Sequence, residues 1–220
     1  MSSANTGSGK ESECFDSITY NLNDHLYTFN VVEAENIPEY NITSTTSVSG
    51  TLSLDEPLIS PRIILGNDGR VRVDNVDDYP YSCIAALTMY WADGTRSFGT
   101  GFMVSEHHML TAGHCVYDNE DTNVPVESIR VYFGRRGSRY LRSYWAANVT
   151  WESTFPVGRT YLTYYTDTFN GQSGGPVYGV NDDFVSGIHH SSNQAGTCNV
   201  GRRVNSAIFN HWMNQGFIHY

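Results

Sequence analysis

Charged side chains are scarce in this chain, and long apolar runs are absent. Only 16% of its 220 residues are Asp, Glu, Lys or Arg, and acidic residues outnumber basic ones by 23 to 13, so the formal net charge is −10 at pH 7. This sign argues against nucleic acid or an anionic membrane as a partner. No run reaches the roughly 18 apolar residues of a membrane-spanning helix. We therefore predict a globular protein that binds neither.

Metal-binding and export signatures are also lacking. The four cysteines (Cys14, Cys83, Cys115 and Cys198) form no CxxC pair, and the chain has no HExxH motif. We therefore expect no metal and no cofactor. Cysteines this far apart are compatible with up to two disulfides in any of three pairings, or with buried thiols. The first 14 residues contain no apolar signal-peptide core, so either the chain stays in the cell or its export signal is not in this sequence.

Short β-prone runs fill the chain from residue 62 onward, and turns rich in Gly, Asn and Asp separate them. Many short strands at such spacing are typical of an antiparallel sandwich or barrel. Residues 1–62 are rich in Ser, Thr, Asn and acids, so we expect a largely irregular leader or pro-segment there. Residues 206–217 change to a helical period, which predicts a C-terminal helix with Ser206 as N-cap and Gly216 at its end.

Two motifs place a histidine and a serine in unusual surroundings. His114 follows small residues in Leu-Thr-Ala-Gly-His-Cys at 110–115, and Ser173 lies among glycines in Gly-Gln-Ser-Gly-Gly-Pro at 171–176. A serine becomes a nucleophile when an imidazole takes its proton and backbone N–H groups bind the oxyanion that forms. Gly171 allows a turn that points its own N–H and that of Ser173 to one spot. The alternative is a glycine-rich hairpin with an incidental serine.

Together the two motifs resemble the chymotrypsin-type (trypsin-like) serine proteases. "LTAGHCVYD" and "GQSGGPVYG" carry this resemblance, while "RIILGNDGR", "YTDTFNGQSGGPVYG", "SGIHH" and "GRRVNSAIFNHWMNQ" make it closest to the glutamyl endopeptidase branch. These segments cover most of residues 62–216. The resemblance implies an all-β fold of two antiparallel β-barrels with the active site between them and a C-terminal helix.

The same resemblance assigns roles position by position. It implies that His114 is the general base, that Ser173 is the nucleophile, and that Gly171 and Ser173 supply the oxyanion N–H groups. It further implies that His189, Thr168 and the free amine of Ile63 bind the side chain of an acidic residue before the cut. Imidazole, hydroxyl and ammonium groups all donate hydrogen bonds to a carboxylate.

Some alternatives weigh less. Asp167, next to Thr168, suggests a trypsin-like pocket for basic residues, which is the weaker reading because "TDT" also occurs within the branch. His107, His108 and His190 are expected to be surface residues.

One element of the resemblance is missing. The family's carboxylate normally follows the histidine within an "Asp-[IYF]-Ala-Leu"-like strand, and this chain has no such motif. His114 and Ser173 are only 59 residues apart, roughly half the family's interval, as if a deletion joined two matching halves around residues 151–165. Loss of the carboxylate is expected to reduce the rate by about 10⁴-fold. Likewise, Gly99 to Gly101 stand where the family's usual partner of Cys115 would be.

These observations lead to one main hypothesis. The chain is expected to be a secreted serine endopeptidase with a pro-segment at 1–62 and a protease domain at 63–216, which comprises a first barrel part (63–150), a second (160–205) and the helix (206–217). A zymogen would be cut between Arg62 and Ile63 by an activating protease, and the enzyme would act on proteins or peptides as a monomer. The alternative is a weak or inactive homologue that binds peptides in the same cleft, because the carboxylate is not found.

Overall fold

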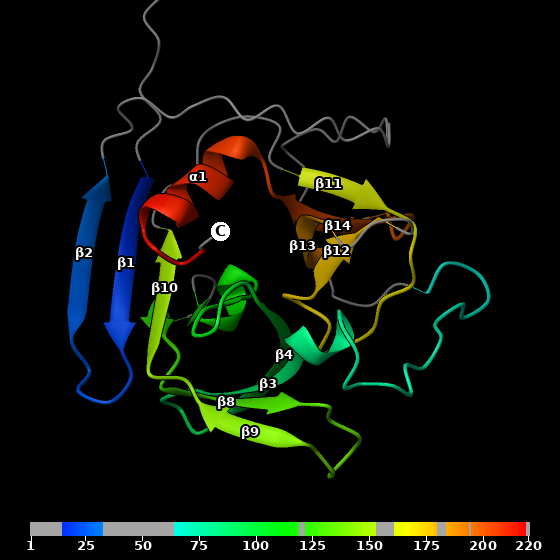
Figure 1. Ribbon diagram of the computed structural model, residues 1–220, viewed down its shortest axis with the longest axis horizontal. Coiled ribbons are helices and arrows are strands. Elements are labelled where there is room, and N and C mark those ends of the chain that lie inside the picture. The colour runs from blue at the N-terminus through cyan, green and yellow to red at the C-terminus, as the bar shows by residue number, and fades with distance from the viewer. Residues whose placement is uncertain are drawn as a thin grey trace, which may run out of the picture.

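The computed structural model describes residues 15–32, 64–118, 122–152, 161–179, 184–193 and 195–218, and their secondary structure is mostly β. Figure 1 shows the arrangement. The strands are β1 (Phe15–Asn21), β2 (Tyr27–Val32), β3 (Ile84–Tyr90), β4 (Arg96–Met103), β5 (Met109–Leu110), β6 (Tyr117–Asp118), β7 (Val124–Pro125), β8 (Ser128–Phe133), β9 (Arg142–Trp145), β10 (Asn148–Glu152), β11 (Tyr161–Tyr164), β12 (Pro176–Tyr178), β13 (Val185–Ser192) and β14 (Asn199–Arg203). Short 3-10 turns lie at Tyr81–Cys83 (η1) and Gly113–Cys115 (η2), and the helix is α1 (Ser206–Asn214).

The first half of the protein is built on a five-stranded antiparallel sheet in the order β5-β4-β3-β8-β9. Its central strand β3 buries Ala85, Leu87 and Met89. These residues alternate along the strand, and alternate side chains of a strand point to the same face. Leu87 is paired with Gly99 in β4 and with Val131 in β8. The apolar face of this sheet is one wall of the main hydrophobic core.

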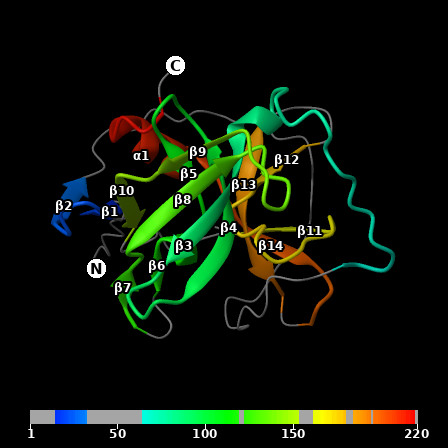
Figure 2. The same ribbon diagram turned by 90° about the horizontal axis from the view of Figure 1, so that it is seen from below.

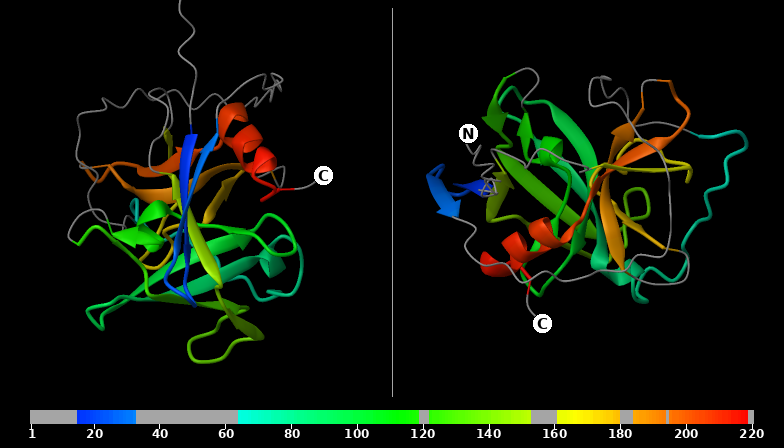
Figure 3. Two further views of the ribbon diagram at one scale, coloured as in Figure 1. Left: turned by 90° about the vertical axis from the view of Figure 1, so that its left-hand side faces the viewer. Right: turned by 90° about the horizontal axis from the view of Figure 1, so that it is seen from above.

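The N-terminal region differs from the irregular leader expected for residues 1–62. Residues 15–32 form the β1–β2 hairpin, and β1 pairs with β10 in a three-stranded sheet of order β10-β1-β2. Figure 3 shows the hairpin standing beside β10. The expectation of irregular structure is wrong for these residues because β1 finds a pairing partner more than 120 positions further along the chain, which local composition does not reveal. Residues 33–63, including Ile63, lie outside the described residues.

The second half is a four-stranded antiparallel sheet in the order β11-β14-β13-β12. A register shift interrupts the pairing of β13 with β14 between His189 and Ser191. Such bulges re-aim neighbouring side chains, and they often occur next to active sites. Figure 2 shows β4 of the first sheet close to β12 and β13 of the second. The two antiparallel sheets lie against each other, which agrees with the predicted all-β class.

The predicted C-terminal helix is confirmed, with a different N-cap. Asn205, not Ser206, caps it: the Asn205 side chain accepts a hydrogen bond from the Ile208 backbone N–H at 2.9 Å. Ser206 is instead the first helical residue. Gly216 follows the helix with a φ of 72°, a left-handed conformation that commonly ends helices. In the described part of the chain no helix has the length and apolarity required to cross a membrane.

Candidate active site

His114 is exposed on the η2 turn, at the edge of the first sheet. Strand β5 leads into this turn, and the Thr111 hydroxyl donates to the Thr100 carbonyl at 2.8 Å. The turn itself closes through a hydrogen bond from the Cys115 N–H to the Ala112 carbonyl. Ala112 and Cys115 are buried, so they anchor the turn in the core. The backbone of His114 is therefore fixed by its buried neighbours, while its imidazole remains exposed.

Ser173 lies in a tight turn that two left-handed glycines make possible: Gly171 has a φ of 86° and Gly174 a φ of 89°. The N–H groups of Gln172, Gly174 and Gly175 are all used in backbone hydrogen bonds. Among the described residues, the N–H groups of Gly171 and Ser173 have no acceptor. The turn thus presents two available donors on either side of one residue, which is the arrangement that an oxyanion requires.

The two sheets bring these turns together. The Thr100 N–H in β4 donates to the Ser173 carbonyl at 2.7 Å, and the Cys115 thiol lies 3.8 Å from the same oxygen. The Ser173 hydroxyl donates to the His190 carbonyl at 3.4 Å. The ring of His190 meets that of His114 edge to face, with centroids 5.0 Å apart. His114 and Ser173 therefore share the neighbour His190.

His190 was expected to be a surface residue, and this expectation is wrong. Its side chain is half-buried, and Nδ1 lies 3.0 Å from the Ser191 hydroxyl. Burial is the main cause that lowers the pKa of His190 to about 4, and a charge on His114 lowers it further. His190 is consequently a neutral imidazole at pH 7. The sequence offered no sign of this contact, because it depends on how β13 approaches η2.

An open cavity of about 2880 Å³ runs between the sheets, and His114, Gly171, Ser173 and His190 all line it. Its apolar wall comes from the first sheet and from α1, with Leu87, Met89, Ile129, Val131, Ile208 and Trp212. His114 and Ser173 therefore border one shared space between the two sheets.

His189, next to His190 on β13, points into a different environment. It is 3% exposed, and burial lowers its pKa to about 4. Nδ1 hydrogen-bonds to the hydroxyl of Tyr164, whose own pKa is raised by burial. A protonated Tyr164 hydroxyl donates to Nδ1 and leaves the proton of the neutral ring on Nε2. That buried Nε2 has no hydrogen-bond partner among the described residues.

Thr168 is buried beside β14. Its hydroxyl donates to the Asn199 side chain at 2.9 Å, and the Asn199 amide donates to the Thr166 carbonyl at 2.7 Å. Asn199 is paired with Tyr164 across β11 and β14. Thr168 and His189 are therefore linked to the same strand pair through Asn199 and Tyr164. The sequence analysis missed Tyr164 and Asn199, since neither lies in a recognisable motif.

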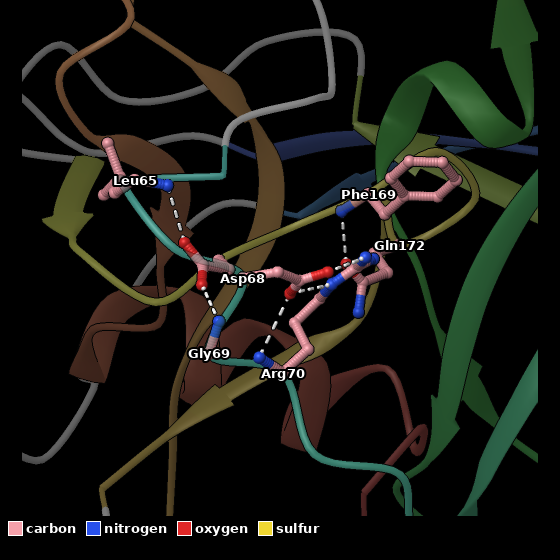
Figure 4. Close-up of polar contacts among 7 residues, drawn as sticks. Leu65, Asp68, Gly69, Arg70, Phe169 and Gln172 are labelled. Carbon is pink, nitrogen blue, oxygen red and sulfur yellow. Dashed lines mark hydrogen bonds and ion pairs between the residues drawn. The ribbon is translucent and has the colours of Figure 1, made fainter.

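Asp167 anchors the segment that follows residue 63. Its carboxylate accepts hydrogen bonds from the backbone N–H groups of Leu65 and Gly69, each at 2.6 Å. In the same region Arg70 lies over the ring of Phe169, at 4.8 Å from its centroid. Figure 4 shows Leu65, Gly69 and Arg70 next to the turn that carries Phe169 and Gln172. Asp167 is thus committed to backbone donors, which leaves it poorly placed to select a basic substrate residue.

Two aspartates that could be considered for the missing carboxylate, one close to His114 in the sequence and one before the first sheet, are engaged by other groups. Asp118 accepts a hydrogen bond from the Thr122 hydroxyl at 2.6 Å, and Asp74 pairs with Arg136 at 3.0 Å. Asp121, Asp182 and Asp183 lie outside the described residues. Among the described residues, no group of three or more His, Cys, Asp or Glu side chains could hold a metal ion.

Of the two readings left open for the cysteines, the structure has free thiols at the three that it describes, Cys83, Cys115 and Cys198. Cys14 lies outside the described residues. Burial raises the pKa of Cys115 to about 11, so this thiol stays protonated. Gly99 faces it, as the resemblance suggested for the missing partner. A Cβ added at Gly99 would lie 2.8 Å from the Cys115 Sγ.

This geometry predicts that Gly99→Cys forms a disulfide with Cys115 under oxidising conditions. The bond would close a loop of 17 residues, for which about 3 kcal/mol of added stability is expected. Thiol titration and the free energy of unfolding, each with and without reductant, measure the effect. The control is Gly99→Ser, which introduces similar bulk without the bond. A variant that keeps all its thiols after oxidation would contradict the prediction.

Comparison with known proteins places these features in context. Residues 71–154 match the family model described as Trypsin. The chain is 26% identical to an extracellular metalloprotease of Bacillus subtilis over 79% of this chain and 77% of that protein. It is 34% identical to the glutamyl endopeptidase of Bacillus licheniformis over 37% of this chain and 24% of that protein.

A solved structure of a Glu endopeptidase in complex with MPD shares the fold, with a TM-score of 0.54 and 18% identity. The match covers 70% of this chain and 99% of that one. The all-β, trypsin-like fold expected from the sequence is therefore confirmed. The histidine turn lies within the segment that matches the family model, and the serine turn lies beyond it.

Proposed function

From the premise that this chain is a trypsin-like serine protease near the glutamyl endopeptidase branch, we propose that it is an endopeptidase that cuts peptide bonds after acidic residues. One observation carries the proposal. The Ser173 turn offers two available N–H donors, and a hydrogen bond from Thr100 holds it beside the turn of His114. A binding protein has no need of oxyanion donors beside a serine.

The proposed reaction follows from these positions. The Ser173 oxygen attacks the substrate carbonyl, and His114 takes the hydroxyl proton. The carbonyl oxygen becomes an oxyanion, to which the N–H groups of Gly171 and Ser173 donate. His114 then gives its proton to the departing amine, and an acyl-enzyme remains on Ser173. Water hydrolyses this ester by the same route and restores the serine.

We further propose that His189 selects an acidic side chain. Its buried Nε2 has no partner among the described residues, and a buried donor gains most from a charged acceptor. Tyr164 supports this role because its hydroxyl bond to Nδ1 holds the proton on Nε2. Thr168 and the amine of Ile63 are proposed to complete the pocket. A secreted location and activation between Arg62 and Ile63 are part of the same proposal.

His190 is proposed to hold the ring of His114 in place of the missing carboxylate. The edge-to-face contact restricts the orientation of His114. A neutral imidazole adds little stabilisation to the charge that His114 gains during the reaction. The enzyme is therefore expected to be slower than a protease with a full triad.

The test is hydrolysis of three chromogenic peptides that are identical except for Glu, Lys or Phe before the cut. The protein is the full chain, with and without prior cleavage at Arg62. Faster turnover of the Glu peptide is expected. No turnover of any peptide, in a protein that melts cooperatively, would instead favour a homologue that only binds peptides.

His189→Leu is expected to lower kcat/KM for the Glu peptide by about 100-fold, because a charged hydrogen bond contributes roughly 1.5–3 kcal/mol, and to affect the Phe peptide little. The measurement is the ratio of kcat/KM values for the two peptides. His107→Leu is the matched control, because His107 is exposed. An unchanged ratio in His189→Leu would remove this residue from the specificity pocket.

A further inference from the structure

We propose that the β1–β2 hairpin, although it precedes the proposed activation site, is a permanent part of the folded protein. After a cut between residues 33 and 63, the N-terminal fragment is expected to remain bound without a covalent link. The hairpin then supplies a strand to the protease body, meaning the described residues from 64 to 218, and is not a pro-segment that leaves.

Backbone pairing ties the hairpin to the body. β1 pairs with β10 in antiparallel register from Ser17 opposite Glu152 to Asn21 opposite Asn148. The ladder continues with a hydrogen bond from the Leu22 N–H to the Ala147 carbonyl at 2.9 Å. In the described part of the chain, β1 is the only strand that pairs with β10. Loss of the hairpin would expose an unpaired strand edge, which promotes aggregation.

Side chains of the hairpin also complete the main core. Tyr20 and Leu22 are 9% and 8% exposed, and they belong to the same cluster as Leu87, Met89 and Val149. The Tyr20 hydroxyl lies 2.7 Å from Nδ1 of His25, which satisfies its polar end within the hairpin. Leaving would return both apolar side chains to water and uncover the core residues beneath them.

The part of the hairpin whose side chains are described lies outside the candidate active site. None of residues 20–26 lines the cavity that holds His114 and Ser173. An inhibitory pro-segment must leave before activity appears, whereas this hairpin has no such need.

Both ends of the intervening stretch are anchored separately. The hairpin is bound to β10, while Asp167 holds the backbone of Leu65 and Gly69. Hydrolysis of one peptide bond between residues 33 and 63 adds one water and produces a carboxylate and an amine. It breaks no contact that the described residues make. The contacts that hold the hairpin on the protease body therefore remain after the cut.

The experiment uses the full chain with a recognition site for a highly specific protease inserted between residues 41 and 53. After the cut, size-exclusion chromatography is run in native buffer and in guanidinium. We expect both fragments to elute together in native buffer, with one cooperative melt, and to separate only in the denaturant. An N-terminal fragment that elutes alone, beside a body that still melts cooperatively, would overturn the proposal. So would a peptidase rate that rises when the fragment is removed.

Two variants sharpen the test. Leu22→Ala is expected to weaken retention of the cut fragment by at least about 30-fold, since it removes a buried leucine. Leu26→Ala is the matched control, because Leu26 is 64% exposed, and it should leave retention unchanged. Equal retention in both variants would overturn the role of core packing. Retention of the fragment is a binding readout, so this part of the test does not depend on whether the protein cleaves peptides.

Discussion

Replacing Ser173 with alanine is expected to reduce kcat/KM for the Glu peptide by at least about 10³-fold, to the background rate. The substitution removes the proposed nucleophile and leaves the oxyanion donors in place. The fold should tolerate it, because among the described residues the Ser173 hydroxyl has a single hydrogen bond, to the His190 carbonyl at 3.4 Å. The measurement is steady-state kinetics together with Tm, which should change by only a few degrees.

Ser143→Ala is the control for Ser173→Ala. Ser143 carries the same hydroxyl, which accepts a hydrogen bond from Arg130 at 2.6 Å in the first sheet. It should retain the full peptidase rate. Residual turnover in Ser173→Ala equal to that of the unmodified protein would mean that another group, or a contaminant, performs the cleavage.

Gly174→Ala is expected to destabilise the protein by at least about 3 kcal/mol and to abolish activity. A Cβ at this position would overlap the carbonyl oxygen of Thr100 and the hydroxyl of Thr111. Its φ of 89° adds backbone strain for any L side chain. The turn that carries Ser173 could not keep its contact with β4. Chemical denaturation, analysed by linear extrapolation, measures the loss.

The control for Gly174→Ala separates strain from overlap. Gly94 has a similar φ of 81°, and a Cβ there would meet nothing within 4 Å. Gly94→Ala should therefore cost only the conformational strain, about 1–2 kcal/mol. If Gly174→Ala and Gly94→Ala lower the free energy of unfolding equally, the close approach of the serine turn to β4 does not contribute to the effect of Gly174→Ala.

The sequence determined the local chemistry. Small residues around His114 and glycines around Ser173 are properties of a few adjacent positions, so the motifs and the turns that they form could be read directly. Alternating apolar residues in β3 and the helical period of residues 206–217 likewise reflect short-range geometry. For the same reason the all-β class and the C-terminal helix were predicted correctly, while the N-cap was misplaced by one residue.

Only the tertiary structure decided which distant groups meet. The pairing of β1 with β10 gives residues 15–32 a place in a three-stranded sheet, and nothing in these residues alone indicates the partner. The contact of His190 with His114 and the bond from Tyr164 to His189 arise between strands that are far apart in the sequence or from different sheets. The structure also decided between the two readings left open for the cysteines, since Cys83, Cys115 and Cys198 are free thiols. Such contacts depend on how strands pair and sheets pack. The covalent chain restricts the distance between residues that are close in sequence, but hardly restricts the distance between residues that are far apart in it.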